Sequence, residues 1–75
     1  MKRIIDGFSY DTDTSILLWF DESKGRRYYA TPNNRYFCVF ATGEFQICTV
    51  DFIKNLLGKY DIARYIEYFG EPKEG

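Results

Sequence analysis

The sequence predicts an α+β fold, in which an antiparallel β-meander of about five short strands precedes two short helices packed on one face. Two observations carry this prediction. Up to residue 48, short apolar runs alternate with turn residues, as in a meander of strands. From Thr49 the apolar spacing changes from two to about 3.6 residues, which is typical of helices. We expect a single domain over 1–75, with the sheet in 1–48, two helices in 49–70 and a tail in 71–75.

Turn residues place the individual strands. Asp6-Gly7 is a strong hairpin signal, because both turn residues must take positive φ, and it joins Lys2–Ile5 to Phe8–Tyr10. A polar corner at 11–14 follows, where Asp and Thr side chains bond to nearby backbone N–H groups. The remaining strands are expected at Ser15–Phe20, Arg26–Thr31, Arg35–Phe40 and Glu44–Cys48.

Two helices are predicted from their apolar stripes and caps. Thr49 and Asp61 are suitable N-caps, and Gly58 and Gly70 can end the two helices. The first stripe contains Val50, Ile53, Leu56, Leu57 and Tyr60, and the second contains Ile62, Tyr65, Ile66 and Phe69. Packing of these stripes on the sheet predicts buried side chains at Ile53, Leu57, Ile62, Ile66 and Phe69.

Two of the strands are apolar on both faces, whereas a half-exposed antiparallel sheet normally alternates apolar and polar residues. The runs are Ile16–Phe20 and Tyr36–Phe40. One face of each run can lie under the helices. The other face requires a cover, which is either a strongly curled sheet that buries both sides or the surface of a partner.

The two cysteines are expected to be free thiols. Phe37 and Val39 should share a core face with Phe45 and Ile47, which pairs 39 with 45 and 37 with 47. Cys38 and Cys48 then lie diagonally across two strands, which is a poor geometry for a disulfide.

The composition provides no catalytic apparatus. Histidine, the commonest general base and metal ligand, is absent, and the net charge is −1. Asp11-Thr12-Asp13 has the spacing of a calcium loop but lacks its further ligands, so a turn role is expected. We therefore expect a non-enzyme without metal or cofactor. The early charges at Lys2 and Arg3 and the short apolar runs exclude a signal peptide and a membrane span, which predicts a cytoplasmic protein.

Aromatic residues are more abundant than a small core needs, with seven tyrosines, seven phenylalanines and one tryptophan. Interfaces concentrate Trp, Tyr and Arg, so the surplus predicts a binding surface on the sheet. Its expected residues are Trp19, Arg26, Arg27, Tyr28, Tyr29, Arg35 and Tyr36. The partner would be a protein or a second copy of the chain. The alternatives are a small nucleic-acid-binding or regulatory module that uses the same Arg/Tyr sheet surface, and a small-molecule sponge formed by two packed chains.

The order of short motifs resembles a known group of proteins. Arg3-Ile4-Ile5-Asp6-Gly7, Tyr10-Asp11-Thr12-Asp13-Thr14, Tyr29-Ala30-Thr31, Arg35-Tyr36-Phe37 and Tyr65-Ile66-Glu67-Tyr68-Phe69-Gly70-Glu71 follow one another along the chain. This order is similar to that of small proteins encoded by phages, plasmids and integrative elements of Firmicutes. Val50–Lys59 departs from the group, whose members carry consecutive glutamates there. The resemblance implies an accessory protein of a mobile element in a bacterial host, which binds and inhibits a host protein such as a CRISPR or other defence nuclease, as anti-CRISPR proteins do.

Overall fold

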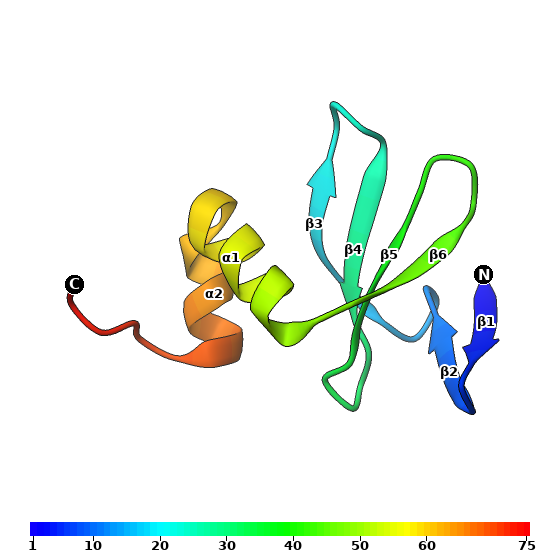
Figure 1. The fold of residues 1–75 in the computed structure, drawn as a ribbon, viewed down its shortest axis with the longest axis horizontal. Helices are drawn as coiled ribbons and strands as arrows, with labels where there is room; N and C mark the ends of the chain where they lie inside the picture. The colour runs from blue at the N-terminus through cyan, green and yellow to red at the C-terminus, as the bar shows by residue number, and fades with distance from the viewer.

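The computed structural model describes all residues from Met1 to Gly75 and confirms the predicted α+β class. Six strands precede two helices (Figure 1). The elements are β1 (Lys2–Ile5), β2 (Phe8–Asp11), β3 (Ile16–Asp21), β4 (Arg26–Ala30), β5 (Tyr36–Val39), β6 (Phe45–Cys48), α1 (Val50–Tyr60) and α2 (Ile62–Phe69). Neither helix has the length and apolar character that crossing a bilayer requires.

The strands form two antiparallel sheets instead of the single sheet expected over 1–48. β1 and β2 make a hairpin of their own, and the second sheet has the order β3-β4-β5-β6. The corner between the sheets is tied to the start of the chain, because the Thr12 N–H donates to the Met1 carbonyl at 2.9 Å. The Asp11 carboxylate also accepts from the Asp13 N–H at 3.0 Å, so the chain turns sharply here. The hairpin thereby leaves the plane of the larger sheet.

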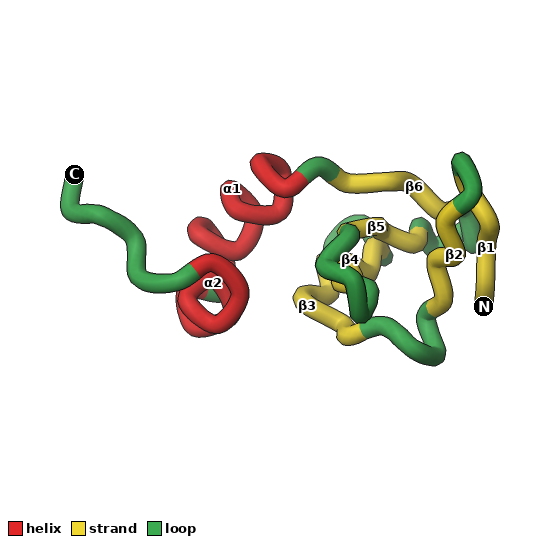
Figure 2. The backbone as a smooth tube through the Cα atoms, turned by 90° about the horizontal axis from the view of Figure 1, so that it is seen from below, coloured by secondary structure: helices red, strands yellow, loops and turns green.

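Three layers result, with the four-stranded sheet between the helices and the hairpin (Figure 2). On one face, Ile53 and Leu57 of α1 pack with Leu18, Tyr28, Ala30, Tyr36 and Cys38. On the other face, Tyr10 of the hairpin packs with Phe37 and Val39. The two apolar faces of β5 are therefore both covered within the chain.

The β1–β2 hairpin turns as the sequence predicts. Asp6 has φ 50° and Gly7 has φ 80°, which are the two positive values that this type of two-residue hairpin needs. A side chain at position 7 would meet no neighbour, so glycine serves the backbone conformation alone.

A β-bulge explains why β3 has no polar alternation. The register shifts between Leu17 and Trp19: Leu17 pairs with Tyr29, and Trp19 pairs with Tyr28. Two consecutive residues, Leu18 and Trp19, thus both reach the helix side of the sheet.

The helix caps are as predicted, but the end of α1 and the orientation of α2 are not. The Thr49 hydroxyl accepts from the Phe52 N–H, and the Asp61 carboxylate accepts from the Arg64 N–H, both at 3.1 Å. α1 continues through Gly58 to Tyr60. A Cβ at Gly58 would lie 3.7 Å from the Tyr65 ring, which is an ordinary van der Waals contact, so the packing of the two helices does not require glycine there.

The prediction that Ile62 is buried is wrong, because 62% of it is exposed. Ile66 and Phe69 are only half-buried. α2 contacts the core through Tyr65 and Phe69, which belong to the predicted stripe, and through Tyr68, which does not. Ile53 and Leu57 of α1 are fully buried, as predicted.

Candidate functional site

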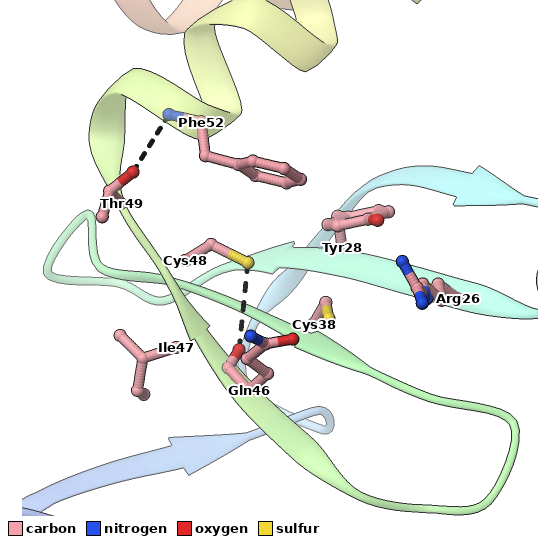
Figure 3. A pocket seen from close by; sticks show the side chains of 8 residues that line it. All are labelled: Arg26, Tyr28, Cys38, Gln46, Ile47, Cys48, Thr49 and Phe52. Atoms are coloured by element: carbon pink, nitrogen blue, oxygen red, sulfur yellow. Dashed lines mark hydrogen bonds between the residues drawn. The ribbon is translucent and has the colours of Figure 1, made fainter.

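An open groove lies where the first turn of α1 rises from the sheet (Figure 3). The helix pair meets β3, where Tyr60 stacks on Trp19 and the Arg64 guanidinium donates to the Leu17 carbonyl at 3.4 Å. Towards β6 the same face of the sheet is left open. The groove has a volume of about 350 Å³ and is lined by Arg26, Tyr28, Cys38, Gln46, Ile47, Cys48, Thr49 and Phe52.

Aromatic rings form one wall of the groove. The Phe52 ring lies 5.9 Å from the Tyr28 ring, and Tyr28 in turn lies 6.3 Å from Trp19. Tyr28 is only 3% exposed, whereas Phe52 is 47% exposed. Phe52 therefore offers an aromatic face that its own chain does not cover, held in place by the capped first turn of α1.

The two thiols lie on the floor of the groove in the predicted register. Tyr36 pairs with Cys48, and Cys38 pairs with Gln46, so the cysteines are diagonal neighbours and remain free. The Cys48 thiol donates to the Gln46 carbonyl at 3.8 Å. Burial raises the pKa of Cys38, and burial together with the neighbouring Cys38 raises the pKa of Cys48 to about 12. Both groups are neutral near pH 7, so they present polarizable apolar surface and not nucleophiles.

Arg26 is the charged residue of the groove. Its guanidinium lies over the Phe40 ring, 4.8 Å from the centroid. Asp21 is its cross-strand partner, but that carboxylate accepts from the Ser23 hydroxyl at 2.7 Å and from the Lys24 N–H at 3.3 Å. The bond to Ser23 contributes most, and together these bonds lower the pKa of Asp21. Arg26 forms no ion pair, since the two in the structure are Met1–Asp13 and Arg64–Glu67. A half-buried cation beside aromatic rings is suited to an anionic group with an apolar neighbour.

The structure divides the predicted binding surface between two faces of the sheet. Trp19, Arg26, Tyr28 and Tyr36 lie on the helix side, where only Arg26 and Tyr28 reach the groove. Tyr28 and Tyr36 are 3% and 5% exposed, so their prediction as surface residues is wrong. Their rings lie in the core between the sheet and the helices, together with Leu18, Ile53 and Leu57.

Arg27 and Tyr29 lie on the opposite face, where β3 and β4 extend beyond the hairpin. The Arg27 guanidinium stands over the Phe20 ring at 4.6 Å, and Tyr29 stacks on Phe37 at 5.1 Å. With Leu17, which is partly exposed, they form a second open area. Each face of the sheet is thus covered over one half and open over the other.

The three arginines of the predicted surface do not form one basic patch. Arg26 and Arg27 are on opposite faces because they are consecutive in a strand. Arg35 precedes β5 and lies over the Phe8 ring of the hairpin at 3.4 Å. The Arg/Tyr sheet surface expected from the sequence, which the nucleic-acid alternative would use, is therefore divided between separate parts of the molecule.

Sequence reasoning missed six of the groove residues, namely Cys38, Gln46, Ile47, Cys48, Thr49 and Phe52. One signal could have indicated Phe52, which is a large apolar residue outside the buried stripe of its helix. The position of the groove depends on where the helices stop covering the sheet, and no local pattern encodes that.

The structure contains no cluster of three or more His, Cys, Asp or Glu side chains that could hold a metal ion. Comparisons of the chain with protein-family models, curated protein sequences and solved structures find no match.

Proposed function

We propose that this protein is a non-enzymatic binding protein of a phage or other mobile element, which acts in the cytoplasm of a bacterial host. It docks on a host protein through the groove beside Phe52 and inhibits that protein. A CRISPR or other defence nuclease is the first class of target to test. The resemblance of the chain to small proteins of mobile elements supports this setting.

One observation carries the binding role: the groove combines an exposed aromatic ring with an unpaired cation. Phe52 is 47% exposed, and Arg26 forms no ion pair. Burying an apolar side chain of a partner against Phe52, Tyr28 and the neutral thiols would contribute about 1.5–3 kcal/mol. A carboxylate next to that side chain would complete a charge-assisted hydrogen bond with Arg26. The groove therefore favours a protein segment in which an apolar residue lies beside Asp or Glu.

The experiment compares two arginines that are neighbours in β4 but lie on opposite faces. Arg26→Gln removes the cation of the groove, and Arg27→Gln removes an equal charge from the other face. A tagged parent protein captures its partner from host lysate treated with nuclease, and the affinity of the purified partner for each variant is then measured. The affinity of Arg26→Gln for the partner should be lower than that of the parent by tenfold or more, and a tenfold loss corresponds to about 1.4 kcal/mol. Arg27→Gln should bind within about twofold of the parent.

A nuclease-activity assay tests inhibition separately. Titrating the parent against a captured nuclease should abolish cleavage at a one-to-one ratio. Arg26→Gln should require a concentration that is higher in proportion to its loss of affinity. Equal losses for both arginine variants, with an affinity that falls steeply with salt, would instead indicate phosphate contacts and the nucleic-acid alternative.

A further inference from the structure

The two outer strands of the larger sheet differ in their protection. β3 has a β-bulge, and Arg64 of α2 covers its Leu17 carbonyl. β6 pairs regularly with β5 over all four residues and has no charged residue and no proline between Phe45 and Cys48. Bulges, charges and covering elements are the devices that prevent a sheet edge from pairing with another chain. β6 has none of these devices within the strand itself, and a charged neighbour is Arg3 of β1, whose guanidinium lies over the Phe45 ring, 5.5 Å from the centroid; β6 is therefore the edge better suited to pairing.

The free backbone groups of β6 belong to Phe45 and Ile47. The Phe40 N–H donates to the Glu44 carbonyl at 2.8 Å, which identifies 40 and 44 as a hydrogen-bonded pair. In an antiparallel ladder such pairs alternate, so Gln46 and Cys48 face β5 with their backbone groups. The N–H and C=O groups of Phe45 and Ile47 consequently point away from β5. None of the backbone bonds outside helices and strands involves them.

A hollow and an exposed side chain lie two residues apart on this edge. The hollow, of about 280 Å³, separates β1 from β6 and is lined by Arg3, Ile4, Ile5, Glu44 and Phe45. Ile47 shares the hairpin side of the sheet with Phe45 and is 43% exposed. An apolar side chain placed opposite Phe45 by a second strand would enter the hollow. Ile47 of a second copy of the chain is an apolar side chain suited to that position.

We propose that β6 is a dimerisation edge at which two copies of the chain pair antiparallel about a twofold axis through Gln46. In this register Phe45 of each copy lies opposite the partner's Ile47, and the outward backbone groups form four hydrogen bonds. Each Ile47 enters the hollow beside the partner's Phe45. Aromatic and β-branched residues are favourable cross-strand pairs. No like charges meet, because Glu44 lies opposite the partner's Cys48.

The twofold axis stands perpendicular to the sheet, so both grooves come to lie on the same side of an eight-stranded sheet. Gln46 of one copy meets the partner's Gln46 at the axis, and each then forms the end wall of the other copy's groove. The two grooves become one continuous trough that carries two arginines. The dimer is a closed assembly, since the contact surface pairs with itself.

Two measurements test the dimer. The molar mass measured by light scattering coupled to gel filtration, at protein concentrations from about 1 µM to about 1 mM, should rise to twice the chain mass of 8.9 kDa. Ile47→Lys should remain a monomer over the same range, with a parent-like circular dichroism spectrum. Gln46→Cys, made in a Cys38→Ala, Cys48→Ala background so that no native thiol can form an intrachain disulfide with it, should form a disulfide-linked dimer on mild oxidation, because opposed residues at this kind of position have Cα atoms about 4.5 Å apart. Asn33→Cys, in an exposed turn, is the control and should link far more slowly.

A monomeric parent at every concentration would overturn the proposal. A dimer that persists in Ile47→Lys, or that fails to link through Gln46→Cys, would also overturn it, because the contact would then lie on another surface. The binding role of the groove does not depend on these results: a monomer can still show the difference between Arg26→Gln and Arg27→Gln.

Discussion

Trp19 and Tyr60 stack face to face, with ring centroids 4.6 Å apart and planes inclined by 10°. The contact joins the bulged strand β3 to the last residue of α1 and lies at the end of the aromatic row that begins at Phe52. Because the bulge turns Trp19 towards the helices, it also decides which half of the sheet they cover. The open groove is the other half.

Removing the Tyr60 ring should therefore loosen α1 at the end away from the groove. Tyr60→Ala should destabilise the fold by about 1–2 kcal/mol, since a stacked pair contributes about 0.5–1.5 kcal/mol beyond its buried area. Trp19 is the only tryptophan, so its emission should shift to longer wavelength in this variant as water reaches the indole. Chemical denaturation followed by fluorescence measures both effects. An unchanged spectrum would contradict the stacking.

Leu57 and Ile62 test the packing of the helix pair. Leu57 is fully buried, so Leu57→Ala should cost about 2–5 kcal/mol of the free energy of unfolding. Ile62 is 62% exposed, and Ile62→Ala should change that free energy by less than about 0.5 kcal/mol. Urea titrations of both variants give the comparison. Equal losses of stability in the two variants would indicate that Ile62 is buried, which would contradict the orientation of α2.

Tyr28 distinguishes a core role from a surface role. Because the ring is buried in the core and lines the groove, Tyr28→Ala should destabilise the fold by about 3–5 kcal/mol. Tyr28→Phe keeps the ring and should retain most of the stability. Thermal melts of the two variants test this. A Tyr28→Ala variant that melts like the parent would place the ring on the surface after all.

Alkaline pH should destabilise the fold. Burial raises the pKa of Tyr28, Tyr36 and Cys38 and brings that of Cys48 to about 12, so the native state disfavours their charged forms. The unfolded chain loses these protons first, from its ordinary cysteine value of 9.0 upwards. The stabilisation is complete below about pH 9 and is lost as pH rises towards 12.

Urea unfolding at several values between neutral pH and pH 11 measures this loss, and Cys48→Ala should show a shallower decline than the parent. Alkylation should also be slow for both native thiols near neutral pH and fast after unfolding. A native protein whose thiols react as fast as free cysteine would contradict the raised pKa values of the two thiols.

Local patterns predicted the parts of the fold that depend on local physics. Asp6-Gly7 requires a particular turn, Thr49 and Asp61 cap their helices, and the facing apolar residues of β5 and β6 set the register that separates Cys38 from Cys48. The bulge at Leu18 was not predictable, because an unbroken apolar run has no alternation from which a register shift can be detected.

The candidate site was less predictable because it depends on how separate elements meet. The hairpin left the plane of the sheet at the turn of residues 11–14, where the Asp11 carboxylate accepts from the Asp13 N–H, and no local pattern sets the direction of that turn. Tyr28 and Tyr36 became core residues only because the helices pack over them. Composition indicated a surplus of aromatic surface, but its division between two half-open faces follows from tertiary packing.

The most direct test of the binding role is a map of the partner's contact surface by backbone amide chemical shifts, recorded on the labelled protein as the captured partner is added. We expect the largest changes at Gln46, Cys48, Thr49 and Phe52, which surround the groove. Changes confined to Leu17, Phe20 and Tyr29, on the open half of the opposite face, would contradict the assignment of the groove as the binding site.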